Sequence, residues 1–331
     1  MSNLHNGKII RWGIIGCGNV TEVKSGPAYK NTEGFELAAV MRRDPDKVRD
    51  YAKRHGIEKY YTDADALIND PDIDAIYIAT PPDSHKHYAL KVADAGKPCC
   101  IEKPMAPSYF DCLVIYQTFK AKNLPLFVAY YRRSLPRFKQ VNQWLLDKHI
   151  GDIRHIRWHL CKPPNAIDSS KAYNWRTDIN IAPGGYFDDL ASHGLDLFTH
   201  LLGNIKDAYG IGTNQQGFYT AKDAITACWI HENGITGSGT WNFASSMHED
   251  AVKIYGSKGT ISFSVFHDNP LILKNTTNDQ ELFIENPKHI QTYHVEGMRN
   301  TLINKDYQHP STGHSALHTS WVMDKILGKL T

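Results

Sequence analysis

Two glycines near the start of the chain have the spacing of a phosphate-binding loop. Gly16 and Gly18 follow an apolar run and precede a segment with the pattern of a helix. The first glycine permits a tight turn, and the second lets the backbone approach a pyrophosphate that rests on the helix N-terminus. Because a long strand–helix alternation follows, we interpret the segment as a dinucleotide-binding loop rather than a glycine turn that binds nothing. The expected cofactor contacts are Gly16, Cys17, Gly18, Asn19 and Val20.

The end of the second expected strand should contact the adenosine ribose. NAD sites usually place an acidic residue there, whereas NADP sites often use arginine. Here the strand ends in Arg42 and Arg43, and Asp44 precedes a proline, where it suits a helix cap better than a ribose ligand. We therefore expect Arg42 and Arg43 to hold a 2′-phosphate, so that NADP(H) is favoured and NAD(H) is the alternative. Without that role they are two solvated arginines at a helix start.

Three further residues have the chemistry needed to oxidise an alcohol. Hydride removal needs a base for the hydroxyl proton and a cation that favours the alkoxide. Lys103 follows a strand at the carboxyl edge of the expected parallel sheet, where such folds bind ligands. His193 carries an imidazole suited to general-base work, and Asp189 lies four residues earlier on the same helical face. Taken separately, Lys103 can be a surface lysine, and Asp189 can be a carboxylate that interacts with the helix dipole.

The same helix carries a polar stripe of metal-ligand types. Asp189, His193, Asp196 and His200 recur at helical spacing, and carboxylates with imidazoles bind zinc and related ions. Four ligands on one straight helix cannot converge on one ion, because each turn advances about 5.4 Å. We therefore expect no metal in the catalytic site.

Two longer segments, taken with the glycine loop, resemble the Gfo/Idh/MocA family over the whole chain. One includes the Glu-Lys-Pro motif that begins at Glu102, and the other runs from Gly184 to Asp196. The resemblance implies that Lys103 contacts the substrate hydroxyl and the nicotinamide ribose. It also implies that Asp189 and His193 form the second catalytic motif, with His193 as the acid/base. The residues implied to line the cofactor are Thr80, Pro81, Pro82, His85, Glu102 and Lys103.

Three positions depart from the family pattern. Thr21 replaces the third glycine of the loop, and Ala191 stands where the family often has glycine. Tyr131 replaces an asparagine that is common before an arginine pair. The first two changes are mild. The third falls on the substrate side, so it weakens any inference from the family about which substrate this chain binds.

Aromatic residues on the substrate side are expected to stack on the apolar faces of a sugar ring. The candidates are Tyr131, Trp175 and Tyr186, and Arg176 is expected to bind a hydroxyl or carboxylate. The alternative for Trp175 and Tyr186 is packing in the core or in an interface.

The elements that must position these residues alternate between strand and helix up to about residue 130. Strands are expected at 9–15, 36–41, 74–79, 98–101 and 126–130, with helices at 19–31, after 44, at 84–95 and at 107–122. Such alternation requires a parallel sheet covered on both faces. The sequence therefore predicts an α/β fold that begins with a Rossmann doubly wound domain over residues 1–130.

The pattern changes after residue 133. A helix is expected at 135–148, a half-buried strand at 153–160, several strands within 206–264 and a last helix at 315–327. We expect a substrate-binding and oligomerisation α/β domain over 131–331, with a large, mainly antiparallel, open sheet. One sheet face is free to pair with another subunit, and the resemblance implies a homodimer or homotetramer.

Composition excludes several classes of partner. The 331 residues carry a formal net charge of +2, which argues against a nucleic-acid or anionic-membrane partner. No run of 18 apolar residues predicts a transmembrane helix, and the first eight residues lack an apolar signal region. The six cysteines show no CxxC spacing, so we expect reduced thiols in a cytoplasmic protein.

These inferences predict an NAD(P)-dependent oxidoreductase that acts on a secondary alcohol or ketone of a sugar, inositol or related polyol. Three alternatives stay open. They are a nicotinamide-dependent glycosidase, a dihydrodiol dehydrogenase and a non-catalytic cofactor-binding sensor of the same fold. Lys103, Asp189 and His193 are all present, which argues against the sensor.

Overall fold

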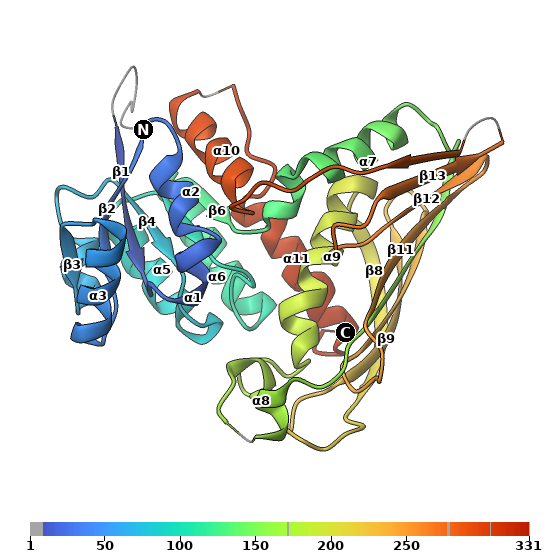
Figure 1. Ribbon diagram of the computed structural model, residues 1–331, viewed down its shortest axis with the longest axis horizontal. Helices are drawn as coiled ribbons and strands as arrows, with labels where there is room; N and C mark the ends of the chain where they lie inside the picture. Colours follow the sequence, from blue (N-terminus) through green and yellow to red (C-terminus); the bar gives the residue numbers. More distant parts are fainter. Residues whose placement is uncertain (1–8, 171, 277–278, 305, 331) are drawn as a thin grey trace. The chain divides into compact units, whose positions relative to one another are not determined.

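The computed structural model describes residues 9–170, 172–276, 279–304 and 306–330, and Figure 1 traces them along the chain. They form two compact units. Unit 1 comprises residues within 1–134 and 287–317, and unit 2 comprises residues within 135–286 and 318–331.

A six-stranded parallel sheet forms the centre of unit 1, in the order β3-β2-β1-β4-β5-β6. The strands are β1 (Ile10–Ile15), β2 (Phe35–Met41), β3 (Lys59–Tyr61), β4 (Ala75–Ile78), β5 (Cys99–Ile101) and β6 (Leu126–Val128). The order reverses between β1 and β4, and such a switch point opens a ligand crevice at the carboxyl ends of the strands. The predicted Rossmann sheet is confirmed, and β3 adds a strand that the sequence analysis did not predict.

Helices cover both faces of this sheet, so its strands are buried on both sides. Alternate residues of one strand enter different cores: Ile76 and Ile78 pack on one face, and Tyr77 packs on the other. The helical segments of unit 1 are α1 (Asn19–Val23), α2 (Gly26–Asn31), α3 (Pro45–His55), α4 (Ala64–Ile68), η1 (Pro82–Ser84), α5 (His85–Asp94), α6 (Tyr109–Ala121), η2 (Tyr131–Ser134) and α10 (Thr292–Ile303). This double cover explains why the strands are nearly continuous apolar runs.

The helix predicted at 19–31 is divided into α1 and α2. Pro27 lies at the start of α2, where its ring suits a first helical turn but would break a continuous helix. A Cβ on Gly26 would also lie 2.2 Å from the Thr21 carbonyl oxygen, so the chain turns sharply there. The prediction of one helix was therefore wrong.

The C-terminal part of the chain returns to unit 1, although the sequence analysis placed every residue after 130 in the second domain. Val295 and Met298 of α10 join the core that contains Trp12 and Tyr77. Thr312 pairs with Phe127 in an isolated β-bridge. The pattern of residues 292–303 gave no prediction of a helix, because its apolar residues are few and irregularly spaced.

Unit 2 is built on an eight-stranded sheet in the order β14-β13-β12-β11-β7-β10-β9-β8. Its β7 and β10 pair in parallel, and the other neighbours are antiparallel, so the predicted mainly antiparallel sheet is confirmed. The strands are β7 (Ile153–Cys161), β8 (Ile205–Thr213), β9 (Ala224–His231), β10 (Thr236–Asn242), β11 (Glu249–Gly256), β12 (Gly259–Phe263), β13 (Leu271–Asn275) and β14 (Asp279–Leu282). The other elements are α7 (Pro136–Leu146), α8 (Ala166–Ser169), η3 (Trp175–Thr177), α9 (Tyr186–Leu202) and α11 (Gly313–Ile326). The first part of α11, up to Leu317, belongs to unit 1.

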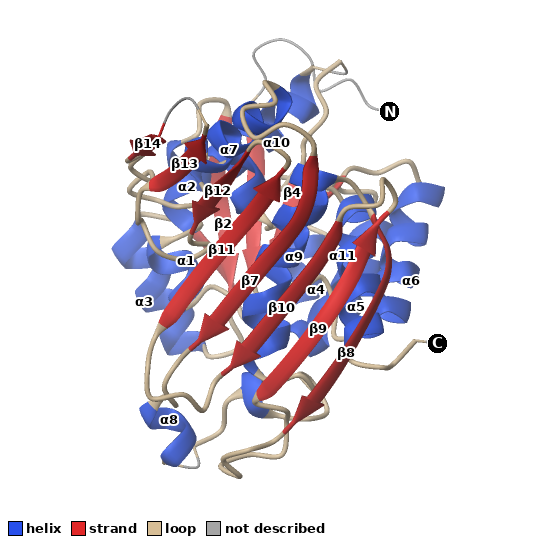
Figure 2. Ribbon diagram, turned by 90° about the vertical axis from the view of Figure 1, so that its right-hand side faces the viewer, coloured by secondary structure: helices blue, strands red, loops and turns tan. Residues whose placement is uncertain are grey.

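One face of this sheet packs on α9. Trp158 contacts Phe198 with ring centroids 5.5 Å apart, and a Cβ on Gly194 would lie 2.3 Å from the Trp158 ring. Figure 2 looks onto the other face, which we call the outer face. The strand periodicity of two places the exposed side chains of Tyr209 and Ile211 there. Among the described residues, no helix has the length and apolar character needed to cross a bilayer.

Candidate active site

The glycine loop connects β1 to α1, and its geometry fits the predicted role. Gly16 has a φ of +90°, and a Cβ there would lie 2.6 Å from the Thr80 side chain. A side chain is therefore excluded by both conformation and space. A Cβ on Gly18 would meet only the Gly16 oxygen, at 3.9 Å. The space beside Gly18 is open, as is needed where a backbone approaches a pyrophosphate, so the loop fits a dinucleotide.

Thr21, at the third glycine position, closes this loop on itself. Its hydroxyl donates to the Gly18 oxygen and accepts from the Gly18 N–H, each at 2.9 Å. The close approach that a third glycine allows occurs instead at Gly26, against the Thr21 carbonyl. The departure from the glycine pattern therefore leaves the turn intact.

Arg42 lies against the glycine loop, as a cofactor contact at the end of β2 requires. Its Nη1 donates to the Cys17 carbonyl oxygen at 3.4 Å, and its side chain is half-buried. Arg43 is exposed. Asp44 caps α3, accepting at 3.1 Å from two backbone N–H groups of the first turn. The predicted cap is confirmed, and the Asp44 carboxylate already accepts hydrogen bonds from the helix backbone.

The loop after β4 is tied to the loop after β5 by His85. This side chain is fully buried; its Nε2 lies 2.7 Å from the Thr80 oxygen, and its Nδ1 lies 3.1 Å from the Pro104 oxygen. Burial lowers the pKa of His85, because desolvation disfavours the imidazolium. These contacts are those of a residue that positions the two loops. Pro81 is exposed beside it, and Pro82 is buried at the start of η1.

Glu102 fixes the backbone of Lys103. The Glu102 carboxylate is buried, and its Oε2 accepts from the Lys103 N–H at 3.1 Å. Its Oε1 accepts from the Tyr77 hydroxyl at 2.6 Å and from Gln291 Nε2 at 2.8 Å. Lys103 itself is partly exposed, directly after β5. Glu102 thus fixes the backbone position of the lysine at the carboxyl edge of the sheet.

Tyr131 and the arginine pair that follows it lie in η2, buried within unit 1. The Arg132 guanidinium stacks over the Tyr131 ring at 4.9 Å. Arg133 donates to the Pro310 oxygen at 3.0 Å. This part of the predicted substrate side is thus held by the returning C-terminal segment.

In unit 2, Asp189 is paired with Arg176. Arg176 Nε donates to Asp189 Oδ2 at 2.6 Å, and the guanidinium lies 4.4 Å from the centre of the Trp175 ring. Trp175 and Arg176 lie in the short η3 helix, and the side chain of the preceding Asn174 caps that helix by accepting from the Arg176 N–H. The structure thus brings Trp175, Arg176 and Asp189 together. The positive charge of Arg176 is paired with a carboxylate of the same chain and not left free for a substrate.

Tyr186, at the start of α9, is also engaged by neighbours. Its hydroxyl donates to Asp168 Oδ1 at 2.7 Å and accepts from Asn174 Nδ2 at 3.0 Å. Burial and the Asp168 carboxylate raise the pKa of Tyr186. The tyrosine therefore joins α8, η3 and α9, and its ring is mostly buried.

His193 lies one turn beyond Asp189 on α9 and is almost fully buried. Its ring contacts Phe266 edge to face, with centroids 5.8 Å apart. Farther along the polar stripe, Asp196 accepts from the Thr319 hydroxyl at 3.0 Å. That carboxylate therefore serves the packing of α9 against α11.

Several supporting residues were missed by the sequence analysis. Gln291 and Asp168 contact site residues, and Asp188 accepts from the Gly184 N–H at 2.9 Å. Asp188 lies in the motif that we singled out, so its position gave a usable signal. Gln291 gave none, because its partner is 189 residues away.

Comparison with known proteins gives matches along both units. Residues 10–130 match the oxidoreductase family with an NAD-binding Rossmann fold, and residues 138–262 match the GFO/IDH/MocA C-terminal domain. Oxidoreductase P35 of Formosa agariphila is 37% identical over 96% of this chain and 98% of its own length. The trans-1,2-dihydrobenzene-1,2-diol dehydrogenase of Bos taurus is 25% identical over 76% of this chain and 72% of its own length.

Solved structures share the fold. A levoglucosan dehydrogenase in complex with NADH and levoglucosan superposes with a TM-score of 0.85 at 20% identity, covering 96% of each chain. At this identity the likeness shows the fold alone.

Proposed function

The chain belongs to the Gfo/Idh/MocA family of nicotinamide-dependent oxidoreductases, and from that premise we propose its reaction. It transfers hydride reversibly between NADP(H) and a secondary alcohol or ketone of a sugar, inositol or related polyol. The observation that carries the proposal is the placement of Lys103 at the carboxyl end of β5, with its backbone held by the buried Glu102.

The cofactor preference rests on Arg42 and Arg43. The cofactor, when bound, accepts or donates the hydride. A 2′-phosphate beside the glycine loop would meet the guanidinium of Arg42, which already borders Cys17, and the exposed Arg43. Asp44 is engaged in capping α3, so it is a poor ligand for a free 2′-hydroxyl. We therefore favour NADP(H), with NAD(H) as the alternative.

The proposed acid–base chemistry is shared among three residues. In the oxidative direction His193 takes the hydroxyl proton, and Lys103 stabilises the developing negative charge on that oxygen. Asp189 holds the neighbouring hydroxyl. Its ion pair with Arg176 fixes the carboxylate on α9.

The substrate class rests on the aromatic and polar groups described above. Tyr131 and Trp175 are proposed to stack on a sugar ring. Arg176 and Tyr186 have partners of their own, so their main contribution is to hold Asp189, Asn174 and Asp168 in place. A cyclic dihydrodiol also presents neighbouring hydroxyls on a ring, and the bovine relative is named for that activity, so this is the second candidate substrate.

Assembly is proposed to use the outer face of the unit 2 sheet. The exposed fractions of Tyr209 and Ile211 are 67% and 69%, and the exposed Ile230 of β9 pairs with Asp207, two residues before Tyr209. Such a patch is typical of a subunit interface. We propose a homodimer or homotetramer, which light scattering of the purified protein would test.

A substrate panel tests the proposal directly. Sugars, inositols, other polyols and dihydrodiols are incubated separately with NADP⁺ and NAD⁺, and the reduced cofactor is followed by absorbance. We expect turnover with a polyol or sugar and a preference for NADP⁺. Release of an aglycone without net cofactor reduction would instead establish a glycosidase, and the absence of any turnover across the panel would favour a sensor.

A further inference from the structure

The outer face carries a cluster of metal-ligand side chains that the proposed reaction does not use. His159 and Cys161 lie two residues apart at the end of β7, so both side chains project to the outer face. Glu249 begins β11 and is paired directly with Cys161 in the antiparallel ladder. The two strands lie side by side in Figure 2. One ligand atom from each residue lies within 4.8 Å of the others.

We propose that His159, Cys161 and Glu249 bind one divalent transition-metal ion of the zinc class. Zinc takes thiolate, imidazole and carboxylate ligands at about 2.0–2.3 Å, so its tetrahedral ligands lie about 3.4–3.6 Å apart. His159 Nε2 and Glu249 Oε2 are already 3.9 Å apart. Side-chain rotations that bring the three ligand atoms about 1 Å closer together would therefore place them at three corners of a tetrahedron. Water would fill the fourth corner.

The surroundings allow these rotations. Ala251 is the residue paired with His159 on β11, and its small side chain leaves room for Glu249 to lean toward the imidazole. His159 and Glu249 are partly exposed, with 39% and 50% of their side chains accessible. Cys161 is buried at the base of the cluster. Two partly exposed ligands beside a buried thiol can close on an ion by side-chain rotation alone.

The ligand types select the metal. A thiolate with an imidazole favours zinc, cobalt or nickel over magnesium and calcium, which prefer oxygen ligands. The ion would join β7 to β11 near the ends of the two strands, and it would stabilise the folded chain because the unfolded chain lacks the preformed site.

Cobalt reports this site directly. The full-length protein, freed of metal by a chelator, is titrated with Co²⁺, and absorbance is recorded in the near ultraviolet and the visible. We expect one ion per chain, a thiolate-to-cobalt charge-transfer band and visible bands of a tetrahedral site. Excess Zn²⁺ should abolish the bands, and excess Mg²⁺ should leave them.

Two matched variants assign the signal. Cys161→Ser should abolish the charge-transfer band, and His159→Gln should weaken Co²⁺ binding by about 100-fold or more, beyond the roughly 10- to 100-fold typical of losing a supporting residue. Cys228, an exposed thiol on β9, is the control, and Cys228→Ser should bind Co²⁺ normally. Thermal unfolding without metal checks that each variant folds, and the substrate assay provides an independent readout.

Three results would overturn the proposal. They are the absence of a thiolate band in the native protein, survival of that band in Cys161→Ser, and its loss in Cys228→Ser. None of these outcomes bears on the oxidoreductase reaction, because the three ligands lie outside the residues assigned to it.

Discussion

Arg176 Nε lies 2.6 Å from Asp189 Oδ2 and forms an ion pair with the α9 carboxylate that the sequence predicts to be catalytic. The same guanidinium stacks on Trp175. We infer that this arginine, which was expected to meet the substrate, instead positions Asp189. Its removal should disturb catalysis without removing any group that exchanges a proton.

Replacing Arg176 by glutamine should lower kcat/KM about 10- to 100-fold, because Asp189 loses the cation that orients it. Arg176→Lys should recover part of the loss, since the charge is retained. Steady-state kinetics of both variants would separate effects on kcat from effects on KM. Arg154→Gln, which removes an exposed pair with Asp152, is the control. Unchanged kinetics in Arg176→Gln would contradict the positioning role.

Replacing Lys103 by methionine should lower kcat about 10²- to 10⁴-fold, because the cation that stabilises the alkoxide is lost. Cofactor binding, measured by quenching of tryptophan fluorescence, should persist. Lys53→Met is the control, because Lys53 is exposed in the last turn of α3 and lies outside the residues assigned to the reaction. Full activity in Lys103→Met would exclude the lysine from the reaction.

Replacing Arg42 by alanine should raise the KM for NADP⁺ about 10- to 100-fold, since a charge-assisted hydrogen bond contributes about 1.5–3 kcal/mol. The KM for NAD⁺ should change much less. Arg49, exposed on α3, provides the control variant Arg49→Ala. A native enzyme that prefers NAD⁺ would disprove the assignment.

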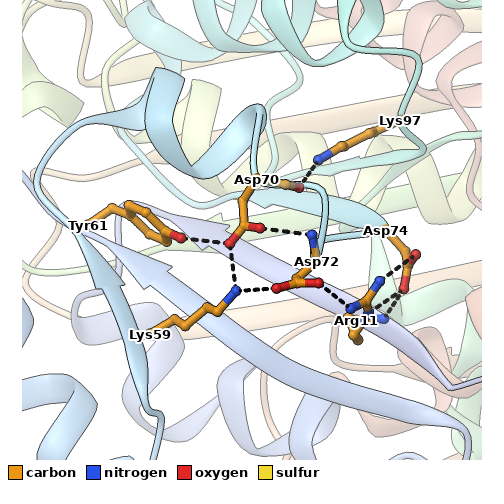
Figure 3. A network of polar contacts seen from close by, with 7 residues as sticks. All are labelled: Arg11, Lys59, Tyr61, Asp70, Asp72, Asp74 and Lys97. Atoms are coloured by element: carbon orange, nitrogen blue, oxygen red, sulfur yellow. Dashed lines mark hydrogen bonds and ion pairs between the residues drawn. The ribbon is translucent and has the colours of Figure 1, made fainter.

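The network in Figure 3 should make unit 1 sensitive to acid. Asp70 accepts from Tyr61 at 2.6 Å and from Lys59 at 3.1 Å, and these contacts lower the pKa of Asp70 to about 2. The folded pKa lies below the unfolded value, so the stabilisation is complete above about pH 4 and is lost as the pH falls to about 2.

Asp70→Asn should therefore reduce the free energy of unfolding by about 1–2 kcal/mol at pH 7, and by much less near pH 2. Denaturant titrations at several pH values measure this difference. Asp94→Asn, which removes an exposed ion pair with Lys122, should show no such dependence. An equal loss at all pH values would attribute the effect to packing.

Asp188 should oppose stability at neutral pH. Burial raises its pKa to about 6, although Lys329 acts in the opposite direction. Because the folded pKa exceeds the unfolded value, the free energy of unfolding falls as the pH rises from about 4 to about 6, and stays lowered above that.

Asp188→Asn keeps an oxygen that accepts from the Gly184 N–H and removes the charge of this half-buried side chain. We expect the variant to gain thermal stability relative to the native protein at pH 8 and to gain none at pH 4. Asp147→Asn, at the exposed end of α7, controls for net charge. A variant less stable than the native protein at pH 8 would show that the attraction to Lys329 dominates.

Much of unit 1 could be predicted because its signals are local. The apolar strands, the turn at Gly16 and the Asp44 cap each follow from residues within one turn or strand. The helix at 19–31 failed because a proline and a close contact at Gly26 outweighed its helical pattern. The return of α10 could not be predicted, because contacts between distant segments leave no periodic mark on either one.

The sequence by itself determined which residues carry chemistry: the glycine loop, the lysine after Glu102, and the acid and imidazole one turn apart on α9. Backbone conformation and helical spacing are enough to encode these features. Only the tertiary structure decided what holds them, by bringing Gln291 to Glu102 and Arg176 to Asp189. Those pairings depend on how distant elements pack, and packing brings together residues whose separation along the chain carries no pattern.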